Sequence, residues 1–183
     1  MILSRQLKYQ VSVDAAEVDR LECEINSAIE QAREMAYGLN PAILISHGLK
    51  AALEELSRSM AKAFQLDCVC EYPQPVDLPD QDVALHLYRI AQEAMQNAVR
   101  HGKARHLVVR LSGHDLIGNM EILDDGVGLP ANDFSPGMGL PNMRTRAQAI
   151  KGRLEVEPRP EGGTRVACIW PIPSRADSIL NLS

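Results

Sequence analysis

Four polar side chains share one face of a predicted helix. Residues 87–101 read LYRIAQEAMQNAVRH, and the polar positions are Glu93, Asn97, Arg100 and His101. With about 3.6 residues per helical turn, these positions fall within a stripe about 100° wide. An adjoining stripe is apolar and can face a core: Leu87, Ala91, Ala94 and Ala98. Alone, the polar stripe is most typical of a solvated helix side. Three glycine-bearing segments downstream favour a second interpretation, the wall of a binding pocket.

The first glycine-bearing segment is DDGVG, which begins at Asp124 and follows the apolar pair Ile122 and Leu123. An aspartate at the end of a strand can accept a hydrogen bond from an exocyclic amine, for instance the amino group of adenine. Gly126 and Gly128 let the backbone approach a flat ligand without a clash at Cβ. Alone, the segment is equally consistent with a turn.

The other two segments are GMGL, which contains Gly137, Gly139 and Leu140, and GGT, which ends at Thr164. GMGL leads into a predicted helix, and backbone N–H groups at a helix N-terminus can hold an anion, although a simple entry turn is the alternative. GGT lies between two predicted strands, either as a hairpin turn or with the threonine hydroxyl in a base pocket.

The predicted helix after GMGL also carries two arginines. Arg144 and Arg146 can each reach a phosphate bound at its start. For Arg146 a solvated helix face is equally plausible.

Composition limits the class of protein. The 183 residues are 45% hydrophobic and 23% charged, which is ordinary for a soluble globular chain of one or two domains. A net charge of −5 argues against general nucleic-acid binding. The four cysteines form no CxxC pair and are expected to be reduced, buried side chains. The apolar runs are too short to cross a membrane, and no signal peptide is visible, so we expect a cytoplasmic location without direct membrane contact. The parent protein could still be membrane-attached.

Hydrophobic periodicity predicts the elements that position these residues. A heptad pattern over residues 15–40 favours self-association as a homodimer over the alternative, a core helix that packs within one chain. Pro41 ends that helix, and Ser46 is expected to cap a second one that extends to Phe64. The elements that follow are a strand at 66–72, a helix from Asp80 or Asp82, strands at 106–112 and 119–124, a helix at 140–150, and strands at 153–156 and 164–170. This order predicts an α+β fold, a two-layer sandwich of a mostly antiparallel sheet and helices, preceded by a long dimerisation helix.

Taken in this order, the four segments resemble the ATP-binding domain of the family that groups gyrase, the heat-shock ninety chaperones, histidine kinases and MutL. LYRIAQEAMQNAVRHGKA, ILDDGVGLP, GMGLPNMRTRA and GGTRV are similar to the N, G1 and G2 boxes and the closing GT segment of bacterial sensor histidine kinases. The resemblance covers about residues 15–171. It implies the C-terminal part of a dimerisation hairpin at 1–44, an ATP-binding catalytic domain at 45–173 and a tail at 174–183.

The resemblance also implies roles for individual residues, with ATP and Mg²⁺ as cofactors. Asn97 would bind the Mg²⁺ that bridges the phosphates, and Glu93 would organise the water on the metal or polarise the attacking group. Residues 129–139 would form a lid. The implied nucleotide-binding residues are Arg100, His101, Asp124, Gly126, Gly128, Gly137, Gly139, Leu140, Arg144 and Thr164.

One feature of the family is missing from this sequence. A sensor kinase needs a phospho-accepting histidine on its first hairpin helix, typically followed by Asp or Glu. No histidine here matches that pattern: His47, His86, His101, His106 and His114. We therefore expect a fragment that binds ATP but does not phosphorylate itself in cis.

In the intact protein, the γ-phosphoryl group would pass to the hairpin histidine and then to a response regulator. The alternatives are an ATP-binding regulatory module without kinase activity, a clamp-type ATPase related to the chaperones, and a serine-kinase anti-sigma factor.

Overall fold

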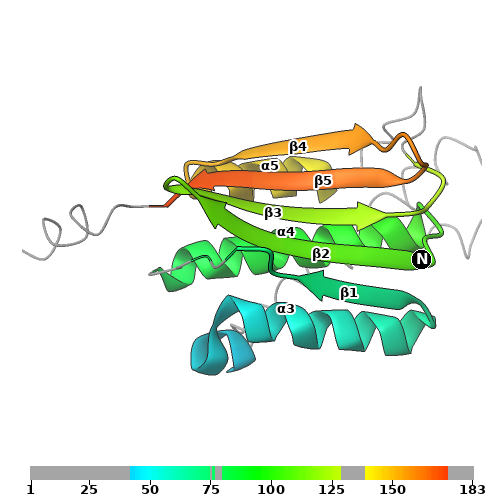
Figure 1. The fold of residues 1–183 in the computed structure, drawn as a ribbon, viewed down its shortest axis with the longest axis horizontal. Helices are drawn as coiled ribbons and strands as arrows, with labels where there is room; N and C mark the ends of the chain where they lie inside the picture. Colours follow the sequence, from blue (N-terminus) through cyan, green and yellow to red (C-terminus); the bar gives the residue numbers. More distant parts are fainter. Residues whose placement is uncertain (1–41, 75, 77–79, 129–138, 173–183) are drawn as a thin grey trace, which may run out of the picture. The chain divides into compact units, whose positions relative to one another are not determined.

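A five-stranded sheet forms the centre of the fold (Figure 1), in the order β1-β2-β3-β5-β4. The computed structural model describes residues 42–74, 76, 80–128 and 139–172. The strands are β1 (Asp67–Glu71), β2 (His106–His114), β3 (Ile117–Asp124), β4 (Arg153–Pro158) and β5 (Thr164–Pro171). β1 pairs with β2 in parallel, and every other neighbouring pair is antiparallel. The predicted mostly antiparallel sheet is therefore confirmed.

Three helices supply the second layer: α3 (Ala42–Phe64), α4 (Gln81–Arg100) and α5 (Gly139–Ala149). Figure 1 shows α4 and α5 behind the strands and α3 alongside β1. α4 contacts both other helices. In the described ranges, no helix is long and apolar enough to span a bilayer.

The core forms where the apolar stripe of α4 meets alternate residues of the sheet. The stripe predicted from the sequence is buried, with Leu87 and Ala91 fully inaccessible to solvent. Period-2 alternation places every second residue of a strand on the same face. The buried apolar side chains of β2 and β3 are Leu107, Val109, Leu111, Met120 and Ile122. Burial of α4 on this side leaves its polar stripe at the edge of the core.

Local capping defines both ends of α4. Asp80 precedes the helix, and its Oδ1 accepts a hydrogen bond from the Asp82 backbone N–H at 2.8 Å, as expected for an N-cap. At the other end, His101 and Gly102 both donate backbone hydrogen bonds to the carbonyl of Asn97. A Cβ at Gly102 would lie 2.6 Å from the Ala98 carbonyl oxygen, so the chain leaves the helix at a position that only glycine fits.

The predicted start of the second helix at Ser46 is wrong. α3 begins at Ala42, and the Ser46 hydroxyl donates back to the Ala42 carbonyl at 2.8 Å. Serine can make either this bond or a cap, and its type alone does not distinguish them. The helical geometry breaks instead at Gly48, where φ is 78° and ψ is 179°. The predicted dimerisation segment 15–40 and the predicted tail 174–183 lie outside the described residues.

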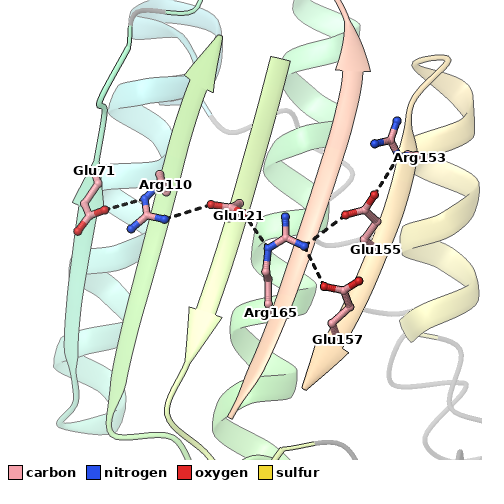
Figure 2. A network of polar contacts seen from close by, with 7 residues as sticks. All are labelled: Glu71, Arg110, Glu121, Arg153, Glu155, Glu157 and Arg165. Carbon is pink, nitrogen blue, oxygen red and sulfur yellow. Dashed lines mark hydrogen bonds and ion pairs between the residues drawn. The ribbon is translucent and has the colours of Figure 1, made fainter. Parts of the chain in front are cut away.

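Alternating charges cross all five strands in one hydrogen-bonded and ion-paired network (Figure 2). At its centre, Glu121 on β3 accepts from Arg110 Nη1 at 3.2 Å and from Arg165 Nε at 2.7 Å. The other members are Glu71, Arg153, Glu155 and Glu157. Burial opposes ionisation of Glu121, but its hydrogen bonds and charge interactions with Arg165 and Arg110 outweigh that effect and lower its pKa. The network therefore keeps Glu121 ionised on this face of the sheet.

We expect Glu121→Gln to lower the free energy of unfolding by about 1–3 kcal/mol, because it removes the charge that two arginines share. The Glu121 side chain is only 12% exposed. Glu157→Gln is the matched control: this side chain is 59% exposed and, among the described residues, pairs only with Arg165, so we expect a loss below about 0.5 kcal/mol. Urea unfolding at neutral pH measures both values. Equal losses for the two variants would contradict the central role of Glu121.

Candidate functional site

The first residue of α5 lies directly against the polar stripe of α4. A Cβ added at Gly139 would overlap the Glu93 carboxylate and lie 3.3 Å from Asn97 Nδ2. A side chain at this position would displace the Glu93 carboxylate, so the N-terminus of α5 lies directly beside the carboxylate and amide of α4. Unpaired backbone N–H groups and the helix dipole favour an anion at such an end.

A buried carboxylate lies at the end of β3. Asp124 is 5% exposed, and its Oδ1 accepts a hydrogen bond from the Gly126 backbone N–H at 2.8 Å. Its Oδ2 makes no hydrogen bond to another described residue. This oxygen can therefore accept a hydrogen bond from a ligand.

Close backbone approaches surround Asp124. A Cβ at Gly126 would overlap the Gly102 carbonyl oxygen, and the Val127 N–H donates to that same oxygen at 2.8 Å. A Cβ at Gly163 would overlap the Asp124 carbonyl oxygen. The glycine turn after β3 therefore lies on the end of α4 and against the start of β5.

The other predicted residues lie near one of two places, the start of α5 beside Glu93 or the end of β3 at Asp124. Gly128 has a φ of 78°, and a Cβ at this position would lie 3.3 Å from the Gly163 carbonyl oxygen. Thr164 is buried at the start of β5. Because Leu123 pairs with Arg165 and the two strands are antiparallel, Thr164 lies beside Asp124 in the sheet. Arg100 and His101 are exposed at the end of α4, which continues the stripe of Glu93 and Asn97.

Besides Gly139, three more predicted residues of GMGL and the helix after it can be placed, and one cannot. Leu140 is half-buried against the core, and Arg144 is exposed on the second turn of α5. Arg146 lines a hollow of about 230 Å³ together with His86, two helical turns before Glu93 on α4. Arg146 therefore lies toward the far end of the α4–α5 contact. Gly137 lies outside the described residues.

The sequence reasoning missed Asp125, the second aspartate of DDGVG. Its Oδ1 accepts from the backbone N–H groups of Arg105 and His106, both at 2.8 Å, and its Oδ2 is 2.7 Å from His106 Nδ1. Desolvation opposes ionisation of Asp125, but these hydrogen bonds outweigh it and lower its pKa to about 2. The same contact raises the pKa of His106. Asp125 thus attaches the glycine turn to the start of β2.

Two further contributors were also missed as site residues: Gly102, whose carbonyl oxygen accepts from the Val127 N–H, and Arg159, which donates to the Asp124 carbonyl oxygen. A glycine after a helix gives no signal of what will lie against it. The Arg159 contact spans 35 residues of sequence, so no local pattern could reveal it.

A metal ion at this site would need ligands from the bound molecule. No group of three or more His, Cys, Asp or Glu side chains in the described ranges could hold one. The nearby amide of Asn97 and carboxylate of Glu93 offer oxygen ligands. Such a set suits Mg²⁺, which typically takes one or two protein oxygens plus phosphates and water.

The chain is similar in sequence to known proteins. Residues 82–174 match the family model described as "Histidine kinase-, DNA gyrase B-, and HSP90-like ATPase". The nitrate/nitrite sensor protein NarX of Escherichia coli K12 is 32% identical over 150 residues, which are 81% of this chain and 25% of NarX. An uncharacterized sensor-like histidine kinase of Chloroflexus aurantiacus is 33% identical over 182 residues, which are 94% of this chain and 30% of that protein. The chain thus spans about a quarter to a third of the length of these relatives.

Solved structures share the fold. The ATP-binding domain of PrrB from Mycobacterium tuberculosis is 28% identical, with a TM-score of 0.54 over 67% of this chain and 93% of that one. The Acinetobacter baumannii histidine kinase AdeS, at 14% identity, superposes with a TM-score of 0.62 over 93% of this chain and 91% of that one. At that identity the likeness shows the fold alone.

We expect the His106 ring to titrate above its ordinary pKa of about 6.5, because Asp125 stabilises the imidazolium. The charged contact is therefore fully present below that pH and is lost as the pH rises through the raised pKa. NMR titration of the His106 ring protons measures it.

Two variants locate the cause of that shift. Asp125→Asn should move the midpoint back toward about 6.5. Asp67→Asn, the control, should move it less, because Asp67 Oδ2 is 3.3 Å from His106 Nε2 and contributes only a charge interaction. A larger effect of Asp67→Asn would contradict the assignment of Asp125 as the principal partner.

Proposed function

The chain belongs to the family of histidine kinase-, DNA gyrase B- and HSP90-like ATPases, and on that premise we propose that it is the ATP-binding catalytic domain of a sensor histidine kinase. In the intact protein, it would donate the γ-phosphoryl group of ATP to a histidine on the dimerisation hairpin. The observation that carries the proposal is the N-terminus of α5 held against Glu93 and Asn97, on the same helix whose end supports the Asp124 turn.

Asp124 is the proposed recognition residue for adenine. Its Oδ2 accepts a hydrogen bond from the exocyclic amine, while Oδ1 remains bonded to the Gly126 N–H. The Thr164 hydroxyl supports the base directly or through water. Gly126 and Gly128 leave room for the flat ring beside the backbone.

The phosphates bind at the other end of the site. Backbone N–H groups at the start of α5 face them, and Arg100, His101 and Arg144 supply positive or ionisable groups nearby. Asn97 would hold Mg²⁺, which supplies charge neutralisation between the phosphates when it is bound. Glu93 would orient water on such a metal or polarise the attacking imidazole. These roles are positioning and electrostatic, as phosphoryl transfer requires.

The partners follow from the same proposal. The acceptor histidine belongs to the dimerisation hairpin and not to the described domain, where none of the five histidines has the required context. A second copy of the chain associates through residues 15–40, and a response regulator receives the phosphoryl group. The relatives support this because they are named as sensor proteins or sensor-like histidine kinases.

We expect the chain to bind ATP more tightly with Mg²⁺ than with a chelator, and Asn97→Ala to abolish that difference, because the variant lacks the proposed ligand oxygen. Isothermal titration measures both affinities. Gln96→Ala is the matched control, since it removes the neighbouring side-chain amide of α4. It should keep the full dependence on Mg²⁺. Absence of ATP binding by the unmutated chain would refute the proposed function.

We expect Glu93→Gln to bind Mg·ATP but to reduce phosphoryl transfer at least about 100-fold, as typical for loss of a group acting on the transferred proton or charge. The assay supplies an acceptor-histidine hairpin and follows labelled phosphate into it. Gln92→Ala, which changes the preceding residue of α4, is the control and should transfer normally. Steady ATP hydrolysis by the unmutated chain with no transfer would instead support the clamp-ATPase alternative.

A further inference from the structure

We propose that Arg159 is a positioning residue that fixes the orientation of Asp124 and thereby sets the preference for adenine over guanine. The inference rests on the proposed role of Asp124 as the acceptor for the base. Arg159 lies in the connection between β4 and β5, outside all four segments that carry the family resemblance.

Within the part of the chain that the structure describes, the guanidinium of Arg159 has one short contact. Its Nη1 donates to the main-chain carbonyl oxygen of Asp124 at 2.6 Å, and the side chain is 28% exposed. Its second contact, from Nη2 to Glu161, is 3.9 Å long, and the Glu161 side chain is 74% exposed. An exposed ion pair at that distance contributes little, so the carbonyl of Asp124 is the principal partner.

The backbone of the same connection holds Arg159 in place. Its N–H donates to the Gly163 carbonyl, and its own carbonyl accepts from the Gly162 N–H, both at 3.0 Å. These bonds close the turn that leads into Thr164. The turn therefore carries the guanidinium and the proposed base-pocket hydroxyl as one unit.

The Asp124 carbonyl needs this donor because of its place in the sheet. The pairing of β3 with β5 ends at Leu123 and Arg165, one residue before Asp124. On the same side, the α-carbon of Gly163 is so close that a Cβ there would overlap the Asp124 carbonyl oxygen. The oxygen is enclosed, and a buried carbonyl is stable only with a hydrogen-bond donor. Arg159 supplies it.

This bond affects the ligand through the Asp124 side chain. Arg159 fixes the main-chain carbonyl, and the Gly126 N–H fixes Oδ1, which together leave Oδ2 in one direction. A carboxylate oxygen in that direction accepts from the amine of adenine but repels the carbonyl oxygen that guanine has at the same position. A site built on one directed hydrogen bond rejects a base that cannot donate it. Without Arg159, the acceptor is less fixed and the discrimination falls.

The test compares binding of Mg·ATP and Mg·GTP by isothermal titration. We expect Arg159→Ala to weaken ATP binding ~10-fold with little change for GTP, so the preference for ATP also falls ~10-fold. Arg159→Lys, which keeps one charged donor, should recover most of it. Arg153→Ala is the matched control: it removes an arginine of the adjoining strand that pairs with Glu155 and is 69% exposed, and it should change both affinities less than ~2-fold.

Two results would overturn the inference. One is an unchanged ATP-to-GTP ratio in Arg159→Ala, including the case in which both affinities and the thermal unfolding temperature fall together, because that pattern marks a purely structural role. The other result comes from the unmutated chain, so it applies even if the variant does not fold. Addition of Mg·ATP should shift the side-chain N–H resonances of Arg159 in NMR spectra more than those of Arg153. An equal or smaller shift at Arg159 would contradict the inference. If the unmutated chain binds no ATP, the proposed function itself fails, and Arg159 has no base to select.

Discussion

The close approach of two glycines to α4 is the constraint on which the site depends. Gly139 brings the start of α5 against Glu93 and Asn97, and Gly126 brings the turn after β3 against the carbonyl of Gly102. One helix therefore sets the distance between the proposed phosphate end and the proposed base end. A side chain at Gly126 would meet the backbone of Gly102, and one at Gly139 would displace the Glu93 carboxylate, so either change would disturb one end of the site.

The same helix also connects the site to the stability of the domain. Its apolar stripe is buried against β2 and β3, while the polar stripe remains at the edge of the core. On the sheet, Glu121 lies three residues before Asp124, and its arginine partners join β3 to both neighbouring strands. β3 is thus held from both sides just before it delivers the acceptor carboxylate. Core packing and the charge network together hold the end of β3 in place, and with it Asp124, as the proposed role of this residue requires.

Local patterns in the sequence predict most of the fold and the principal polar residues. The amphipathic stripe of residues 87–101 and the alternation of the later strands identify α4 and the antiparallel sheet, because periodicity reports which face is buried. The start of α3 was misplaced at Ser46 because a serine can either cap a helix or donate to the carbonyl four residues before it. The contacts of Asp125 with His106 and of Arg159 with Asp124 depend on strand register and tertiary approach, which no short segment encodes. The proposed dimerisation segment 15–40 and Gly137 stay predictions from sequence.

The central claim is that one nucleotide spans from the Asp124 turn to the start of α5. The most direct measurement is a two-dimensional ¹⁵N–¹H NMR titration of the chain with the magnesium complex of a non-hydrolysable ATP analogue. We predict that the largest amide shifts occur together at Gly126, Gly139 and Gly163, with small shifts on the charged sheet face at Arg110 and Glu121. Shifts confined to one end of α4, or centred on that sheet face, would contradict it.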